Sequence, residues 1–376
     1  MPPKSKPSNP PDTRPLINLT KSTQILLSHY QSSLLPAKLS SSSNVSSTSS
    51  SSTTTTSNPL DTIKATTTLL RSHTTTLSLL LLTPPFTPTA VATKLSDVTM
   101  KSLTNMVNAA ASPSGMGALM RSEVSAGVRR VLSAWGKLLA LVGRLAEKGA
   151  VAEAEAEKQE VLSITGVVWE ACDALLKICQ DGVVGVVVRK AEGFRAVLLD
   201  AVEELKEWGE DVDDEEGDAA EGSDGEGGNE FADEDEIFGA ANKLGKGDKE
   251  LKALLDTSVK RLKMVGIFYQ ALIKRRLKTF PSPTSSATNG ETADGTQTDP
   301  TTKLEQLMDL LKTIPDTIDD LASAFYDLNE DEAKETLDQC CSEAKRAAEI
   351  VKQSWTGQDD EFTAWAGKFI SALEAA

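Results

Sequence analysis

The chain has 376 residues, of which 39% are hydrophobic and only 5% aromatic, and its formal net charge at pH 7 is −16. Leu, Val and Ala dominate the apolar residues, a composition that favours helices packed on helices over a β-sandwich. An acidic balance makes duplex DNA and anionic membranes poor direct partners, because both select basic surfaces.

The negative charge is concentrated in one stretch. Fifteen acidic residues, and no Lys or Arg, lie between Glu210 and Glu236. This pattern predicts an exposed, solvated loop over residues 209–247. Three roles stay open for the loop: a spacer, a docking strip for a basic surface such as a basic-region transcription factor or histone tail, and a segment regulated by phosphorylation of Ser223.

Hydrophobic periodicity predicts helices through the first half of the chain, after an N-terminal tail (1–12) that is expected to be disordered. The candidate helices cover residues 13–35, 59–82, 88–111, 117–148 and 157–180. The helix over 117–148 has the clearest pattern, because its apolar residues recur in steps of three and four and form one stripe. These residues are Met120, Val124, Val128, Val131, Trp135, Leu138, Val142 and Leu145. Residues 37–58, nearly all Ser and Thr beyond position 40, predict a disordered linker inside an N-terminal bundle over 13–181.

The second half shows the same periodicity. Candidate helices cover 186–208, 248–278, 301–328 and 330–355, with a last helix after Gly357. Gly182 is expected to end the preceding helix, Pro315 to interrupt the helix in which it lies, and Asn329 to cap the next one. Residues 185–376 therefore predict a C-terminal bundle, with a disordered linker over 279–300. The expected fold is all-α: two up-and-down bundles of about five long amphipathic helices each.

No residue pattern indicates catalysis, a cofactor or a metal. The two histidines, His29 and His73, lie in the N-terminal third, and the glycines at 239–247 lack the spacing of a phosphate-binding loop. The four cysteines are Cys172, Cys179, Cys340 and Cys341. None is spaced as in a zinc site, so we expect reduced, buried thiols in an intracellular protein that is not an enzyme. The basic residues 274–276 are expected to be a solvated helix end.

Two patches resemble a known family. Thr165–Leu175 reads TGVVWEACDAL, Pro315–Tyr326 reads PDTIDDLASAFY, and an acidic stretch lies between them. Together they resemble the cyclin-D-interacting (cyclin-D-binding) protein family, over about Ala90 to the C-terminus. The resemblance implies an all-helical protein of cytoplasm and nucleus that binds other proteins and holds back cell-cycle entry and helix-loop-helix transcription factors. It implies no particular binding residue in this chain.

Four aromatic residues are candidate partner contacts: Phe362, Trp365 and Phe369 on the last helix, and Trp169 within the first patch. Each lies on an apolar helix face and therefore also fits a bundle core, although a terminal amphipathic helix is easily displaced to dock elsewhere. The resulting hypothesis is a non-catalytic adaptor that binds cyclins or helix-loop-helix regulators. The alternative is a vinculin-like cytoskeletal or trafficking scaffold, because long helical bundles also build such proteins.

Overall fold

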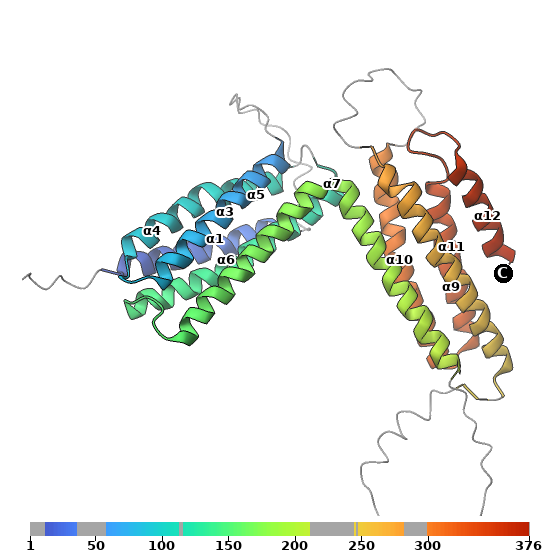
Figure 1. Cartoon of the computed structure of the whole chain (residues 1–376). Coiled ribbons are helices and arrows are strands. Elements are labelled where there is room, and N and C mark those ends of the chain that lie inside the picture. Colours follow the sequence, from blue (N-terminus) through green and yellow to red (C-terminus); the bar gives the residue numbers. More distant parts are fainter. Residues whose placement is uncertain are drawn as a thin grey trace, which may run out of the picture. The chain divides into compact units, whose positions relative to one another are not determined.

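The computed structural model describes residues 12–35, 58–112, 116–210, 244–245, 247–281 and 299–375. Within these ranges the regular structure is entirely helical (Figure 1), which confirms the predicted all-α class. The chain divides into two compact units, Met1–Val186 and Val187–Ala376. Each unit is an up-and-down helical bundle.

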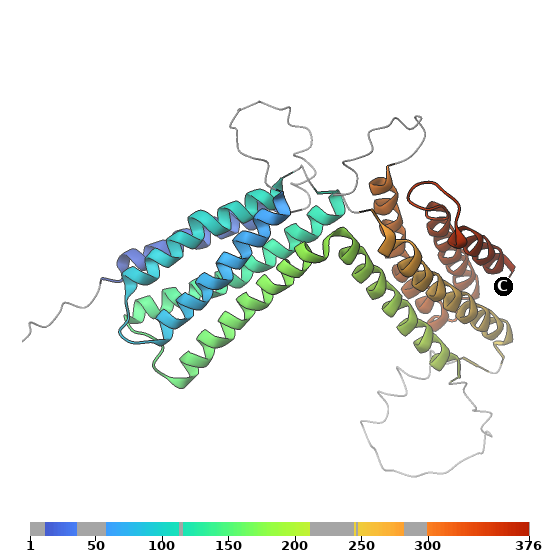
Figure 2. The ribbon, with the colours of Figure 1, turned by 45° about the horizontal axis from the view of Figure 1, so that its top comes forward.

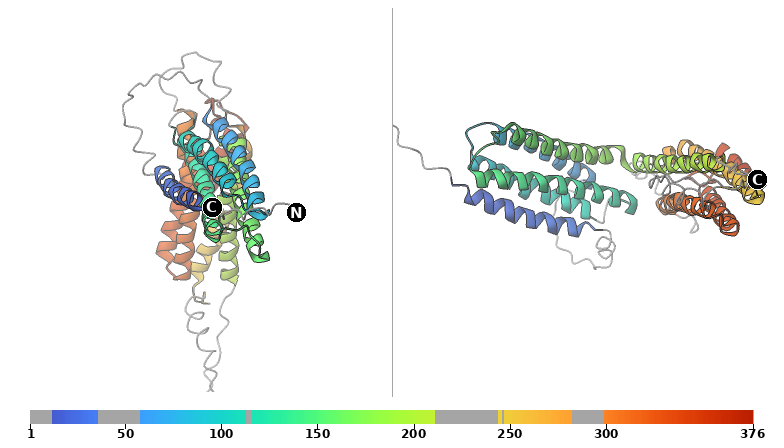
Figure 3. Two further views of the ribbon diagram at one scale, coloured as in Figure 1. Left: turned by 90° about the vertical axis from the view of Figure 1, so that its left-hand side faces the viewer. Right: turned by 90° about the horizontal axis from the view of Figure 1, so that it is seen from below.

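The first unit is built around α6, the helix predicted over 117–148. Its helices are α1 (Arg14–Ser33), α3 (Pro59–Leu82), α4 (Pro88–Asp97), α5 (Thr104–Ala111), α6 (Ala118–Lys148) and the first part of α7 (Glu155–Glu210). Figure 3 shows α6 between α1 and α7. Every residue of the predicted apolar stripe on α6 is buried, and both Trp135 and Val128 are fully enclosed. The broad apolar face therefore forms the core of this bundle.

The predicted helix over 88–111 is present but irregular, because a π-helical turn, Val98–Leu103, separates α4 from α5. The Thr104 hydroxyl donates to the Thr99 carbonyl at 3.0 Å. The Tyr30 hydroxyl of α1 lies 2.9 Å from the Thr104 oxygen and acts as the donor of that pair, since the Thr104 proton is already used. The Thr104 hydroxyl therefore binds the Thr99 carbonyl at the point where the helical hydrogen-bond pattern changes, and Tyr30 binds Thr104 in turn.

The two helices predicted over 157–180 and 186–208 are joined in α7, which lies partly in each unit. The backbone breaks at Gly182, with φ 63° and ψ −164°, a conformation open essentially to glycine alone. A Cβ atom there would meet no other atom within 4 Å, so the backbone conformation and not crowding requires glycine. This geometry agrees with the predicted helix end. Because α7 extends to Glu210, the first two residues of the predicted loop 209–247 are helical.

The second unit contains the rest of α7 and four further helices, which run side by side in Figure 2. They are α9 (Lys249–Arg275), α10 (Pro300–Tyr326), α11 (Glu330–Ile350) and α12 (Glu361–Ala375), with a 3-10 turn, Leu277–Thr279, after α9. Asn329 caps α11 as predicted, since its side chain accepts the backbone N–H of Glu332.

The prediction that Pro315 interrupts its helix is wrong, because α10 continues through it. Proline lacks the N–H that would bind the carbonyl four residues earlier, which is that of Leu311. The Tyr269 hydroxyl of α9 donates to that carbonyl oxygen at 2.7 Å. Tyr269 is fully buried, and burial raises the pKa of its hydroxyl far above the ordinary range, so the group stays protonated. A neighbouring helix therefore supplies the donor that proline removes.

We expect Tyr269→Phe to lower the free energy of unfolding by about 1–3 kcal/mol, because the Leu311 carbonyl would be buried without a donor. Urea denaturation followed by tryptophan fluorescence measures the change. In a Pro315→Ala background the helix supplies its own N–H, so Tyr269→Phe should be less destabilising there. An equal loss in both backgrounds would contradict the pairing of Tyr269 with the proline gap.

Candidate protein-interaction surface

The three candidate contacts on α12 lie together. Phe362 and Phe369 are buried and Trp365 is half-buried. The Phe369 ring stacks on Phe268 of α9 at 5.1 Å between centroids and on Trp365 at 5.6 Å. Phe362 also contacts Trp365, at 5.4 Å. These aromatic contacts hold α12 against the bundle, and a role for these residues in partner binding stays a prediction.

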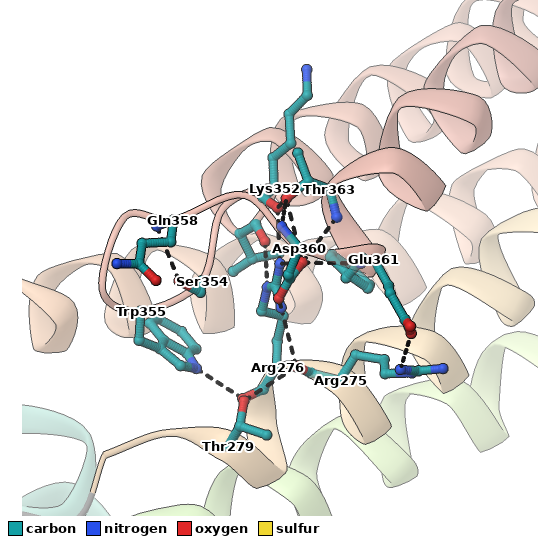
Figure 4. Close-up of polar contacts among 12 residues, drawn as sticks. Arg275, Arg276, Thr279, Lys352, Ser354, Trp355, Gln358, Asp360, Glu361 and Thr363 are labelled. Atoms are coloured by element: carbon teal, nitrogen blue, oxygen red, sulfur yellow. Dashed lines mark hydrogen bonds and ion pairs between the residues drawn. The ribbon is translucent and has the colours of Figure 1, made fainter.

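Arg276, directly after α9, is almost completely buried, with only 2% of its surface exposed. The prediction of a solvated helix end over 274–276 is therefore wrong for this residue. Trp355, the last residue of the helix predicted over 330–355, instead follows α11, which ends at Ile350. Its indole N–H donates to the Arg276 carbonyl at 2.9 Å. Both residues lie at the point where the chain enters α12 (Figure 4).

All five N–H donors of the Arg276 guanidinium have acceptors (Figure 4). The Nε atom donates to the Val351 carbonyl at 2.7 Å. The terminal nitrogens bind the two carboxylate oxygens of Asp360 at 2.7 and 2.8 Å. They also donate to the carbonyls of Arg275 at 3.3 Å and Lys352 at 2.9 Å. We call this cluster the Arg276 clamp, and its guanidinium has no donor left for a ligand.

Asp360 joins the clamp to the start of α12. Its carboxylate accepts the backbone N–H groups of Phe362 at 3.0 Å and Thr363 at 3.1 Å, which caps the helix. The hydrogen bonds from Arg276, helped by those backbone donors, lower the pKa of Asp360 to about 2. One carboxylate thus serves both as a helix cap and as the counterion of a buried cation.

Two adjacent arginines give a matched test of the clamp. Arg276→Met should lower the free energy of unfolding by about 2–4 kcal/mol, because buried carbonyls and Asp360 lose their donors. Arg275 pairs with Glu361 on the surface, where 61% and 85% of the two side chains are exposed. Arg275→Met should therefore change stability by less than about 1 kcal/mol. Chemical denaturation of both variants provides the comparison, and equal effects would contradict the clamp.

The clamp also predicts a pH dependence. The pKa of Asp360 is lower in the folded state, at about 2, than the ordinary value of 3.8. Its stabilising contribution is therefore complete above the ordinary pKa and is lost as the pH falls from about 4 towards 2. Urea midpoints across this interval should fall less steeply for Asp360→Asn than for the unmodified chain. In the Arg276→Met background, the pH dependence of the urea midpoint should be the same with Asp360 as with Asn at that position. A persistent difference between the two would argue against the pairing of Arg276 with Asp360.

Trp169, the fourth candidate contact, fastens α7 to α3. It is half-buried, and the Arg71 guanidinium of α3 lies 5.6 Å from the centre of its ring. Arg71 also pairs with Asp173, one turn further along α7, at 2.9 Å. The buried indole nitrogen of Trp169 has no hydrogen-bond partner among the described residues. These contacts account for Trp169 within the first bundle, and its role in partner binding stays a prediction.

The cysteines singled out in the sequence are enclosed, and Ser223 lies outside the described residues. All four cysteines are buried and free of disulfides. Burial raises the pKa of Cys172 to about 12 and that of Cys179 to about 11, which keeps these thiols protonated and unreactive. The described residues contain no cluster of His, Cys, Asp and Glu suited to a metal ion. Ser223 and most of the predicted acidic loop lie outside the described residues.

An open pocket of about 210 Å³ lies between α6 and α7 in the first unit. It is lined by Arg130, Ser133, Ala134, Lys137, Val167, Glu170, Ala171 and Ala174. Sequence reasoning missed it, although small residues face each other on the two predicted helices. We call this pocket and its rim the α6/α7 groove.

Comparison with known proteins identifies the domain that contains this groove. Residues 62–211 match the family described as Grap2 and cyclin-D-interacting, N-terminal. This stretch carries a domain of that family. The resemblance seen in the sequence is thereby confirmed, but the matched region begins before Ala90 and leaves out the patch Pro315–Tyr326.

A protein of Schizosaccharomyces pombe (strain 972), described as uncharacterized, is 25% identical to this chain over 210 residues. The aligned part covers 56% of this chain and 53% of the relative, so the chain spans about half the length of the curated relative that it matches.

No helix within the described ranges combines the length and the apolar character that a membrane crossing requires.

Proposed function

We propose that this chain is a non-catalytic adaptor that binds a D-type cyclin through its first unit. The observation that carries the proposal is the match of residues 62–211 to a family described as cyclin-D-interacting. That stretch covers most of the first bundle, including α3, α6 and the first part of α7. Binding through a preformed helical surface suits such a bundle, because its helices already present ridges and grooves to a partner.

The state of the reactive groups supports a role without catalysis. The buried thiols and the Tyr269 hydroxyl have raised pKa values, and the donors of Arg276 are all used within the fold. A catalytic site needs titratable groups that converge on an accessible pocket, whereas these groups serve packing. The resemblance of Thr165–Leu175 to the family extends the proposal to helix-loop-helix regulators as further partners, and to action in cytoplasm and nucleus.

We expect the full chain to bind a D-type cyclin with a dissociation constant at least about tenfold below that for an A-type cyclin. Biolayer interferometry with the immobilised full chain measures both constants. Equal constants, or no binding to either, would count against the proposal. Trp365→Ala tests whether α12 takes part in cyclin binding. Unchanged affinity for the cyclin supports binding through the first unit, whereas a loss of affinity would place the binding surface on α12. Co-sedimentation with actin filaments tests the scaffold alternative.

A further inference from the structure

The α6/α7 groove has two basic residues that the fold leaves without partners. Arg130 and Lys137 are exposed on α6, and neither forms an ion pair or hydrogen bond within the described part of the chain. Further along the same two helices, Arg144 pairs with Glu160 and Lys148 with Glu157. The interface between α6 and α7 is therefore closed by ion pairs at one end, whereas at the groove Arg130 and Lys137 have no ion-pair partner within the described residues.

The floor of the groove is apolar. Ala134 and Ala171 are buried at 4% and 5% exposure, and Ala174 lies beside them in the lining. Val167 leaves 37% of its surface exposed at the rim. Small side chains on adjacent helices allow the ridge of a third helix to approach closely. Such a surface suits a helix that presents apolar side chains to it.

The spacing of the two cations indicates what the bound helix would carry. Arg130 and Lys137 are seven residues apart, which is two helical turns or about 10.5 Å along α6. A helix lying along the groove can place two carboxylates seven residues apart opposite them, with apolar residues in the turn between against the alanines. Glu170 is the one acidic residue of the lining; it leaves the net charge at +1, too little for a polyanion such as nucleic acid.

We propose that the α6/α7 groove is a docking site for an acidic amphipathic helix of a partner protein, with carboxylates seven residues apart flanking an apolar turn. This inference rests on the proposed adaptor function only for the identity of the partner. Attraction between exposed charges is modest, so the apolar contact supplies affinity and the two charge pairs fix the register of the helix.

The test uses two labelled helical peptides of about 18 residues, long enough to hold helical structure when stapled. One carries Glu at the two positions seven apart and Leu between them, and the other carries Lys in place of both Glu residues. Fluorescence anisotropy with the full chain should show saturable binding of the acidic peptide, weakened as the salt concentration rises from about 0.05 to 0.3 M. It should show at least about tenfold weaker binding of the basic peptide.

Charge reversal then tests the site. Arg130→Glu/Lys137→Glu should weaken binding of the acidic peptide about tenfold or more and strengthen binding of the basic peptide. The matched control is Lys260→Glu/Lys263→Glu, which makes the same change of charge at exposed lysines on α9 and should leave both affinities unchanged. All four side chains are exposed, so circular dichroism should show equal helicity in both variants.

Two outcomes overturn the inference: no saturable binding of the acidic peptide, or an equal loss in the groove variant and the α9 control. Parallel titrations with a D-type cyclin separate this inference from the proposed function. If the peptide affinities change with the charge reversal as expected, the docking site is supported even if the cyclin does not bind. Cyclin binding without saturable peptide binding overturns the docking site and leaves the adaptor proposal standing.

Discussion

A bundle of long helices tolerates an interruption only where another group takes up the backbone atoms that the interruption leaves unpaired. In the second unit α9 and the residue that directly follows it meet this requirement at two places. Tyr269 donates to the Leu311 carbonyl, which a proline leaves without its helical donor. Arg276 donates to the carbonyls of Val351 and Lys352, which follow the end of α11. The regularity of α10 and the position of α12 therefore both depend on α9.

The two donors lie seven residues apart, so a single face of α9 and its continuation serves both neighbours. The two groups suit different surroundings. A buried tyrosine hydroxyl stays neutral and satisfies one acceptor. A buried guanidinium retains its charge, and it therefore needs the carboxylate of Asp360 as well as carbonyl acceptors. That carboxylate also caps α12, so the counterion of the buried charge fixes the first turn of the last helix.

Local patterns in the sequence were sufficient for the features that neighbouring residues determine. The apolar stripe through Trp135 predicted the buried face of α6, and Asn329 and Gly182 predicted a helix cap and a helix end. Pro315 and Arg276 were misjudged because partners far along the chain decide their roles. The donor beside the proline comes from 42 residues before Leu311, and the carboxylate beside Arg276 comes from 84 residues after it. No local pattern indicates such partners.

The candidate surface follows the same division. An aromatic residue on an apolar helix face gains most from burial inside its own bundle. Phe369 is buried in this way, and Trp169 is half-buried against Arg71. What a bundle leaves open is the groove between two helices whose facing residues are too small to fill it. The cations on the rim of the α6/α7 groove hold no other element in place, whereas Arg276 holds three segments together. Charges in the groove can therefore set partner choice while the fold stays intact, because stability and recognition depend on different residues.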